Sequence, residues 1–346
     1  FASHCACRDS DGQLHDFCYR LPEEEKIHGL RFSCEHMDSI KDLGLLDTSH
    51  LWFTVEDITT PVFVTAFSSN HQREVVSLVE ENWRWKLNTE LLYELCHTDF
   101  SFQKWNFLEF RQFNFTRYPQ YVRNLDEFRW KPIIIAEMLK EFSSIWYMDS
   151  SIVFKKGDLS HVYELIKCRK YVTHRPPVKP IFVRDLREAL TEHESGWDVH
   201  QWNQNVDECR KMSICFYLIV GRQAFLSANN LRVGAPEIYK FIPTNFAEIK
   251  KPKAKMYDAG FVFAARTRDT IEKIVKWYVL CALEEDCMAG NHREWTYCRF
   301  LGDRFSEPPK CHRFDQSVVN LLAANAFYYD RHYYVSEIVD FFNIER

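Results

Sequence analysis

Hydrophobic positions along this chain fall into short runs, each followed by a polar loop and then by a helical pattern. Residues 61–67 form a β-rich run that ends in the polar loop Ser-Ser-Asn-His of residues 68–71. Residues 74–83 then space their valine and leucine side chains along one face of a helix. This order predicts the opening of a βαβ unit. No glycine-rich fingerprint follows the strand, which argues against a P-loop or a dinucleotide-binding fold.

The same alternation returns before residue 150. Pro132 suits a first helical position, and apolar side chains follow it at helical spacing as far as Phe142. The apolar run of residues 145–148 then predicts a strand that stops at Asp149, followed by two serines. Strands alternating with helices favour a parallel sheet, whose ligands bind beyond the carboxyl ends of the strands. Asp149 is therefore a candidate ligand-binding residue, with a helix cap or turn as the alternative.

Outside these segments, hydrophobic and polar positions alternate less regularly. We expect an irregular lead-in over residues 1–60 and a second strand within the aromatic-rich segment, at 107–115. Residues 155–255 are polar and contain several prolines, which predicts irregular structure with a few helices. Further expected elements are a strand at 257–265, helices at 270–283 and 318–324, and a tail that ends in one more helix.

Composition narrows the class of protein. The 346 residues are 46% hydrophobic and 16% aromatic, which is typical of a globular protein with a large core. A net charge of −5 without a dense Lys/Arg stripe argues against a broad nucleic-acid surface. No apolar run approaches the roughly 20 residues that cross a bilayer. Because the chain begins at Phe1 without a methionine, we expect a fragment whose start, with any membrane anchor, has been removed.

Cysteine usage indicates the compartment. The chain has 12 cysteines and no Cys-x-x-Cys, so zinc-ribbon and thioredoxin-like sites are disfavoured. Asn114-Phe115-Thr116 is an N-glycosylation acceptor. An even cysteine count and this motif favour an oxidising compartment with disulfides, the alternative being a cytosolic protein with free thiols. The spacing leaves the connectivity open, although four of the cysteines could staple the polar N-terminal segment: Cys5, Cys7, Cys18 and Cys34.

Three segments, in this order, resemble GT-A-fold glycosyltransferases, in particular animal type II membrane proteins found in nematodes and molluscs. They are residues 64–71, residues 128–151 from Phe-Arg-Trp-Lys-Pro to Tyr-Met-Asp-Ser-Ser, and the pair 258–260 and 315–317. The resemblance implies an α/β fold: a GT-A-like (Rossmann-like) mixed, mainly parallel sheet flanked by helices. It also implies a disulfide-tied extension at 1–60 and one domain at 61–346, with a nucleotide-binding half at 61–155 and an acceptor and sugar half at 156–346.

The resemblance assigns roles to residues of the donor site. The nucleotide base and ribose would lie against Ala66, Ser68 and Asn70. Asp149 matches the first acidic position of the Asp-x-Asp motif that holds Mn²⁺ against the donor diphosphate, and Ser151 stands at the second. Divalent cations prefer two or three hard oxygen ligands, so this pair would bind metal weakly. Metal could act through the diphosphate alone, or the cations Lys131 and Arg129 could replace it.

Further roles concern the sugar. The segment Asp315-Gln316-Ser317 resembles that of retaining enzymes, which implies that Asp315 bonds sugar hydroxyls and that Gln316 lies close to C1. Asp258 would contact donor or acceptor hydroxyls, and Gly260 would leave room for close approach. Because a glutamine cannot act as a base, a retaining mechanism is slightly favoured over an inverting one, which needs such a group. The histidine–glycine–lysine metal motif of one retaining family is missing, with His332 as a candidate substitute.

Taken together, the resemblance implies transfer of a hexose, such as galactose, from a UDP-sugar to a glycan or glycoprotein acceptor in the Golgi lumen. A non-catalytic glycan-binding protein is the second interpretation. A glycoside hydrolase, the third, lacks a recognisable carboxylate pair. Simpler roles remain open for several of these side chains: a solvated first-turn cation for Lys131, a helix cap for Asp315, a strand-edge position for Asp258, surface positions for His71 and His174, and core positions for Trp130 and Trp146.

Overall fold

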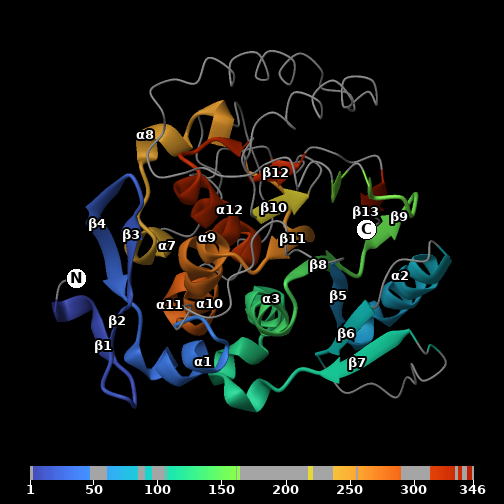
Figure 1. Ribbon diagram of the computed structural model, residues 1–346, viewed down its shortest axis with the longest axis horizontal. Coiled ribbons are helices and arrows are strands. Elements are labelled where there is room, and N and C mark those ends of the chain that lie inside the picture. Colours follow the sequence, from blue (N-terminus) through green and yellow to red (C-terminus); the bar gives the residue numbers. More distant parts are fainter. Residues whose placement is uncertain are drawn as a thin grey trace.

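The computed structural model describes residues 3–46, 61–84, 90–95, 105, 107–160, 162–163, 217–220, 237–254, 256–289, 312–331, 334–336 and 341–344. At its centre is a seven-stranded sheet of order β12-β10-β11-β8-β5-β6-β7 (Figure 1). Its strands are β5 (Val62–Phe67), β6 (Glu90–Glu94), β7 (Leu108–Gln112), β8 (Ser144–Asp149), β10 (Tyr217–Val220), β11 (Phe261–Ala265) and β12 (Val335–Ser336).

The sheet is mainly parallel, as predicted. Strands β5, β6, β7 and β8 pair in parallel, and so do β10 and β12. Strand β11 is antiparallel to both of its neighbours, β8 and β10. Because β11 runs in the opposite direction, its first residues lie at the same edge of the sheet as the last residues of β5 and β8. This edge holds the candidate site.

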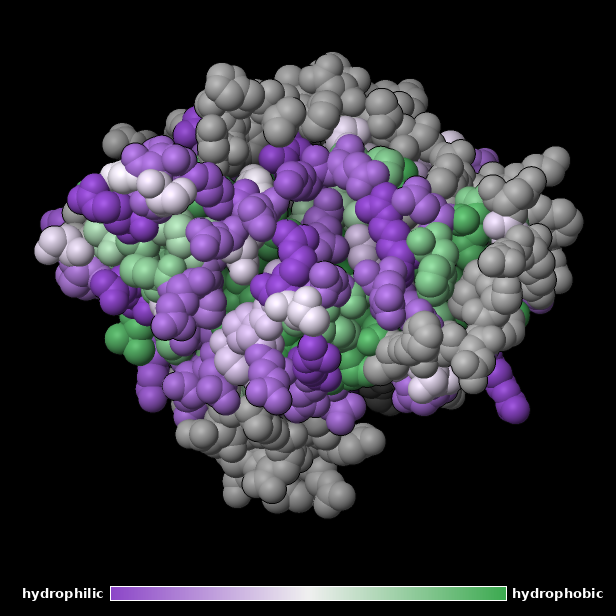
Figure 2. All heavy atoms as spheres, turned by 90° about the horizontal axis from the view of Figure 1, so that it is seen from below, coloured by the Kyte–Doolittle hydropathy of each residue, from purple (hydrophilic) through white to green (hydrophobic). Residues whose placement is uncertain are grey.

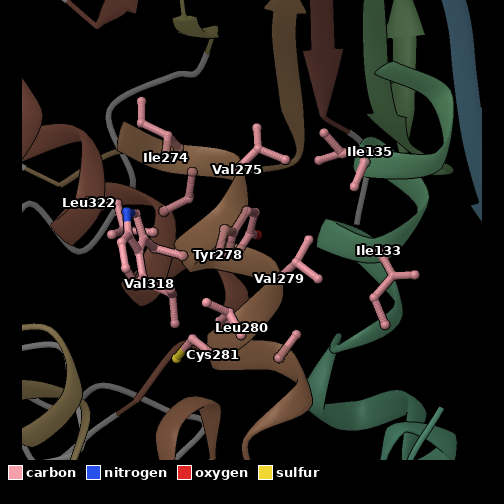
Figure 3. Packing of buried hydrophobic residues seen from close by; sticks show 14 of the residues in the cluster. Ile133, Ile135, Ile274, Val275, Tyr278, Val279, Leu280, Cys281, Val318 and Leu322 are labelled. Atoms are coloured by element: carbon pink, nitrogen blue, oxygen red, sulfur yellow. The ribbon is translucent and has the colours of Figure 1, made fainter. Parts of the chain in front are cut away.

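The central strands β5, β8 and β11 are buried on both faces of the sheet. Alternate side chains of a strand point to opposite faces, and in β8 Tyr147 joins one hydrophobic cluster while Trp146 joins another. Tyr147 faces the helices α3 (Trp130–Glu141), α10 (Lys276–Leu283) and α12 (Phe314–Ala326). In Figure 3, side chains of these three helices interdigitate, for example Ile133 with Val279 and Tyr278 with Val318. This packing fixes where α3 and α12 begin.

The opposite face is covered by different elements. The helix α2 (Gln72–Arg84), which follows β5 as predicted, contributes Leu78 to the cluster around Trp146. The same cluster includes the small antiparallel sheet of β9 (Ile152–Phe154) and β13 (Phe342–Ile344). The predicted helix at the end of the tail is therefore wrong, because β12 and β13 are strands that complete sheets. Their pairing partners lie far away in sequence, and hydrophobic spacing does not record them.

The N-terminal segment is more regular than predicted. It contains two antiparallel hairpins, β1 (Ala6–Arg8) with β2 (Leu14–Asp16) and β3 (Cys18–Leu21) with β4 (Glu24–Arg31), followed by the short helix α1 (Met37–Asp42). Disulfides Cys5–Cys18 and Cys7–Cys34 tie it together, so these four cysteines do staple this segment. A third disulfide joins Cys281 to Cys287. The cysteines at 96, 168, 209, 215, 298 and 311 lie outside the described residues.

The N-terminal segment has no separate core. Phe17 and Phe32 belong to the same hydrophobic cluster as α10 and α12, and Phe32 stacks on Phe241 of the short helix α7 (Ile238–Phe241). Gly29 of β4 is essential for this approach, because a Cβ there would lie 1.9 Å from the carbonyl oxygen of Phe241. The extension is thus packed firmly against the rest of the protein.

Several boundaries differ from the predicted ones. Strand β6 was missed, and α3 begins at Trp130, two residues before Pro132. The predicted helix at 270–283 consists of α9 (Arg268–Thr270), a π-helical turn (Ile271–Val275) and α10. Two further short helices are α8 (Phe246–Ile249) and α11 (Glu285–Met288).

The described helices differ from what a membrane span requires. None of the helices in the described ranges has both the length and the apolar character needed to cross a bilayer. Figure 2 shows a mostly hydrophilic face with small hydrophobic areas. Scattered exposed hydrophobic residues of this kind are ordinary for a folded protein.

Candidate functional site

The candidate site is built around a buried ammonium group. Nζ of Lys131, in the first turn of α3, lies 2.9 Å from Oδ1 of Asp149 and 2.7 Å from Oδ2 of Asp315. Asp149 ends β8, and Asp315 is in the first turn of α12. The consecutive elements α3 and β8 therefore meet the distant helix α12 at one cation.

Lys131 is not the solvated cation that its position in a first helical turn would suggest, since only 3% of it is exposed. A buried ammonium is unfavourable unless it is paired and hydrogen-bonded. Burial alone would lower the pKa of Lys131, but the carboxylates of Asp149 and Asp315 outweigh burial and hold that pKa well above its usual range. The ammonium is therefore a fixed positive charge.

Asp149 is the member of this set that solvent can reach, with 37% of its side chain exposed. Its amide donates a hydrogen bond to the carbonyl oxygen of Gly260, 2.7 Å away, at the entrance of β11. Asp149 directly precedes a turn through Ser150 and Ser151 that leads into β9, so the helix-cap alternative is wrong, whereas the turn alternative describes its backbone. Ser151 lies in this turn and is half-buried.

Gly260 allows the close approach that the sequence predicted for it. A Cβ at this position would lie 2.8 Å from Oδ2 of Asp149 and 3.4 Å from Cγ. A larger residue would therefore displace the carboxylate from its place beside Lys131. Gly260 thus shapes the site directly.

Asp315 is buried, with 6% exposed, and its side chain binds Lys131 while its backbone continues α12. The N-cap residue of α12 is Arg313, which makes no side-chain cap bond and whose amide donates to Oγ of Ser317 at 3.0 Å. Burial raises the pKa of Asp315 above its usual value, although Lys131 opposes this shift. Asp315 is therefore a site residue and not merely a cap.

Gln316 follows Asp315 and is also buried, with 4% exposed. Its side-chain Nε2 has no hydrogen-bond partner in the part of the chain that the structure describes. Buried polar atoms are usually paired, and an unpaired one at a site is a candidate ligand contact. The side-chain amide of Gln316 can therefore donate a hydrogen bond to a ligand oxygen.

Asn320 is a positioning residue that the sequence did not suggest. It is fully buried, its Oδ1 accepts a hydrogen bond from the amide of Tyr257 at 3.0 Å, and its Nδ2 donates to the Tyr257 carbonyl at 2.9 Å. The same Nδ2 donates to the carbonyl of Gln316 at 2.8 Å. Asn320 thus ties the segment before Asp258 to the start of α12. An amide within an otherwise apolar helical run was the available signal.

The predicted nucleotide-binding residues lie on the neighbouring strand. Ala66 of β5 is the register partner of Asp149 in the parallel pair β5–β8. Beyond the end of β5, the hydroxyl of Ser68 donates to Oδ1 of the exposed Asn70. The structure therefore brings Ala66 beside Asp149 and places Ser68 and Asn70 just past the same edge of the sheet.

Asp258 is half-buried and lies two residues before Gly260, on the chain that enters β11. Its neighbour Tyr257 is held by Asn320 through both backbone groups. Asp258 is therefore near the edge that carries Asp149, and its proposed contact with substrate hydroxyls stays a prediction.

Arg129 does not belong to the site. Its Nε binds Glu127 at 2.6 Å, and its guanidinium donates to the carbonyl oxygens of Ala282, Glu284 and Glu285 at 2.8–2.9 Å. These carbonyls end α10 and begin α11, so Arg129 acts as a structural cap. The suggestion that Arg129 replaces a metal is therefore wrong.

Several aromatic and imidazole side chains occupy the core or surface positions that were the simpler interpretations of the sequence. Trp130 and Trp146 are buried core residues, with 6% and 0% exposed. His71 is an exposed residue whose Nδ1 lies 3.5 Å from Oε1 of Glu74. His174 and His332 lie outside the described residues.

Metal binding fits poorly at Asp149 and Ser151. Oδ1 of Asp149 is already bound by Lys131, so only its Oδ2 is left for a metal. One carboxylate oxygen and one hydroxyl do not make the set of hard oxygens that Mn²⁺ or Mg²⁺ prefers. Elsewhere in the described ranges, His4, Cys5, Cys18 and His28 lie close enough for one ion, but the two sulfurs form a disulfide.

The charges of the site set the kind of ligand it accepts. One ammonium and two carboxylates leave one net negative charge if all three are ionised. The positive dipole ends of α3 and α12 both lie here, which stabilises negative charge. The carboxylates and the Gln316 amide together offer acceptors and a donor for a ligand rich in hydroxyl groups.

Residues 5–136 match a family described as a protein of unknown function, DUF1647. No curated protein matches the sequence. Among solved structures, the ligand-free bifunctional glycosyltransferase WbbM is similar over 78% of this chain, with 12% identity and a TM-score of 0.36. The chain spans 38% of the length of that structure.

Proposed function

We propose that this protein is a glycosyltransferase that moves a hexose, such as galactose, from a UDP-sugar to a glycan or glycoprotein acceptor. The observation that carries the proposal is the convergence of Asp149 and Asp315 on buried Lys131, at the carboxyl edge of β5 and β8. Ligands of open α/β sheets bind at this edge. The mixed, mainly parallel sheet with covered faces supports the GT-A fold that the sequence resembles.

The donor would lie along this edge. Its base and ribose would contact the end of β5 at Ala66 and the loop residues Ser68 and Asn70. Its hexose would reach Asp149 and Asp315, whose carboxylates accept hydrogen bonds from sugar hydroxyls. This arrangement uses the side chain that solvent can reach, Asp149, as the first contact, and the buried Asp315 as the deeper one.

We infer that the transfer does not use a resident metal ion. Lys131 already neutralises the carboxylate that a cation would need, and Ser151 offers only a hydroxyl. A fixed positive charge in a water-poor site can stabilise negative charge that develops on a departing diphosphate. The positive ends of α3 and α12 would supply most of this stabilisation, since Asp149 and Asp315 already balance the charge of Lys131.

The chemistry we favour is front-face, retaining transfer. The bond between sugar C1 and the diphosphate oxygen breaks while an acceptor hydroxyl oxygen bonds to C1 from the same face. The leaving phosphate accepts the hydroxyl proton, so no protein base is required. Gln316, whose Nε2 has no partner among the described residues, would contact the reacting region, and Asp258 would hold acceptor or donor hydroxyls.

We place the reaction in the secretory pathway, in the Golgi lumen, as for the type II membrane enzymes that the sequence resembles. Three disulfides among the described residues suit an oxidising compartment. Asn114 of the glycosylation motif is exposed, as an acceptor must be. Glycosylation at Asn114 is a simple check of this placement.

A non-catalytic glycan-binding protein is the second candidate. The observation in its favour is that Lys131 occupies both carboxylates, which could leave the site able to bind sugars but not to assist a leaving group. The two functions differ in one product: only the enzyme releases UDP from a UDP-sugar when an acceptor is present.

Thermal unfolding with nucleotides tests the proposal, because a ligand that binds the folded state raises its stability. We expect UDP to raise the Tm equally with Mn²⁺ and with a chelator. Asp149→Asn should weaken UDP-galactose binding about tenfold, which corresponds to roughly 1.4 kcal/mol. The matched control is Asp42→Asn, since Asp42 is an exposed acid that pairs with Arg117 on the surface.

Three outcomes would contradict parts of the proposal. Unchanged UDP-galactose affinity in a folded Asp149→Asn variant would reject the site. A UDP effect that requires Mn²⁺ would reject the metal-independent mechanism. Glycan binding without release of UDP from any sugar donor would favour the non-catalytic protein.

A further inference from the structure

Phe128 has a backbone conformation that a phenylalanine rarely adopts. Its φ is 53° and its ψ is 23°, in the left-handed region. Only glycine adopts this conformation routinely, since a side chain beyond Cα is strained there. Four non-glycine residues in the described ranges have positive φ: Phe128, Phe314, Tyr328 and Tyr329. Phe128 is the one that is exposed, at 39%.

The chain on either side imposes this conformation. The amide of Phe128 donates to the carbonyl of Leu125 at 3.1 Å and so closes the 3-10 helix Leu125–Glu127. The carbonyl of Phe128 accepts from the amide of Lys131 at 3.1 Å, at the start of α3. Glu127 and Arg129, on both sides, form a fully buried ion pair. The hydrogen bonds of this turn come from the backbone of Phe128, and a glycine would fit that backbone better.

The ring lies at the candidate site. Nζ of Lys131 is over the Phe128 ring, 5.4 Å from its centroid, and the same Nζ binds Asp149 and Asp315. The Trp130 ring lies 6.1 Å from that of Phe128. One side of the Phe128 ring therefore faces the ammonium, and a large part of the residue stays open to solvent. Strained residues that persist against an easier alternative concentrate at functional sites.

We propose that Phe128 is a platform on which a pyranose ring stacks while Asp149 and Asp315 bond its hydroxyls. The apolar face of a pyranose, lined by C–H groups, matches the flat face of an aromatic ring. The carboxylates, held by Lys131, match its polar rim. This inference concerns the same site as the proposed function. If the stacked sugar is the donor hexose, the inference rests on that function. The stacked ring belongs either to the donor hexose or to the glycan acceptor.

The experiment compares four variants. Phe128→Gly removes the ring and relieves the backbone strain, and Phe128→Leu keeps apolar bulk without a flat face. Phe128→Tyr keeps the face and is the rescue variant. The control is Phe246→Leu, because Phe246 is exposed at 48% on α8 and has an ordinary backbone conformation.

Each variant is measured with UDP, with UDP-galactose and with an array of oligosaccharides in the absence of nucleotide. We expect Phe128→Gly and Phe128→Leu to lose about tenfold in affinity for the sugar ligand, as for one lost stacking contact. A loss with UDP-galactose assigns the platform to the donor, and a loss on the array assigns it to the acceptor. UDP affinity and the Tm of Phe128→Gly should not fall, whereas Phe128→Tyr and Phe246→Leu should resemble the wild type.

The results separate this inference from the proposed function. If wild-type protein binds no UDP but Phe128→Gly loses glycan binding, the nucleotide-sugar function fails and the platform stands. Equal sugar binding by wild-type protein and Phe128→Gly overturns the platform alone. A wild type that binds no sugar in either arm overturns it too, and so does a loss of sugar affinity that is matched by a fall in Tm.

Discussion

Two buried cations at the start of α3 have different partners and lie toward different parts of the molecule. Arg129 and Lys131 are separated by one tryptophan, and both are buried, with exposed fractions of 0% and 3%. Arg129 points toward the end of α10, where it binds Glu127 and three backbone carbonyls. Lys131 points toward the edge of the sheet, where it binds two carboxylates from β8 and α12.

The difference lies in the partners and not in burial. The partners of Arg129 are mostly backbone carbonyls, which cannot be protonated and cannot be offered to a ligand. The partners of Lys131 are carboxylates, of which Asp149 is partly open to solvent. Arg129 also donates through a planar fork that suits several fixed acceptors, whereas Lys131 is a compact point charge. A buried cation therefore has a structural role at the end of α10 and belongs to a candidate site at the edge of the sheet.

The largest expected effect is the loss of the Arg129 cation. Arg129→Met leaves Glu127 as a buried, uncompensated carboxylate and three carbonyls without their donor. We expect the free energy of unfolding to fall by about 4 kcal/mol, the usual result of removing one partner from a buried pair. Chemical denaturation measures this loss.

A double variant tests how much the carbonyl contacts of Arg129 contribute to stability. Adding Glu127→Gln to Arg129→Met removes the stranded charge but leaves the carbonyls of Ala282, Glu284 and Glu285 unpaired. The double variant should therefore recover only a minor part of the lost stability. Full recovery would mean that the carbonyl contacts contribute little, and the structural assignment of Arg129 would then be wrong.

Much of the framework was predictable from the sequence because it is local. The strand at β5, the helix α2 and the strand that ends at Asp149 follow from hydrophobic spacing within single segments. Strand β6 and the strands β12 and β13 were not predicted, because their identity depends on pairing with distant segments. Local spacing cannot distinguish such short strands from loops or helices.

The site shows the same limit at the level of residues. Asp149 could be singled out because it ends an apolar run, and the resemblance added Asp315 and Lys131. Which of two neighbouring cations would meet those carboxylates depends on the rotation of α3 against α12, which packing decides. Asn320 was missed for a similar reason, since its partner Tyr257 is brought to it only by the folded chain.

The second prediction concerns the loss of the Lys131 cation. Lys131→Met strands Asp315 in a buried position, and we expect a loss of about 3 kcal/mol in the free energy of unfolding at pH 7. Unlike the carbonyls near Arg129, Asp315 can be made neutral. The double variant Lys131→Met/Asp315→Asn should therefore recover most of the stability and none of the UDP-galactose binding. Failure to recover stability would show that Lys131 has a structural role like that of Arg129. Recovered binding would remove Lys131 and Asp315 from the site.

A half-buried cation, Lys276, lies against the N-terminal segment and has different partners again. Its Nζ donates to the carbonyl of Asp16 at 3.0 Å and lies 4.7 Å from the centroid of the Trp277 ring. Burial lowers the pKa of Lys276 from 10.5 to about 8, and the carboxylates of Asp16 and Glu272 offset this only in part. Lys131, with two carboxylates in contact, shifts in the opposite direction.

The lowered pKa predicts a pH dependence of stability. Between about pH 8 and pH 10.5 the folded protein has released the Lys276 proton while the unfolded chain still binds it. Stability therefore rises with pH across this window, by at most roughly 3 kcal/mol. Lys276→Met removes this dependence and leaves other titrations in place, so the difference between the two unfolding profiles isolates it. A difference that stays flat from pH 8 to 10.5 would show that Lys276 keeps its proton and that a carbonyl and aromatic rings suffice to hold a half-buried ammonium. In that case paired carboxylates would no longer set Lys131 apart from the other buried cations.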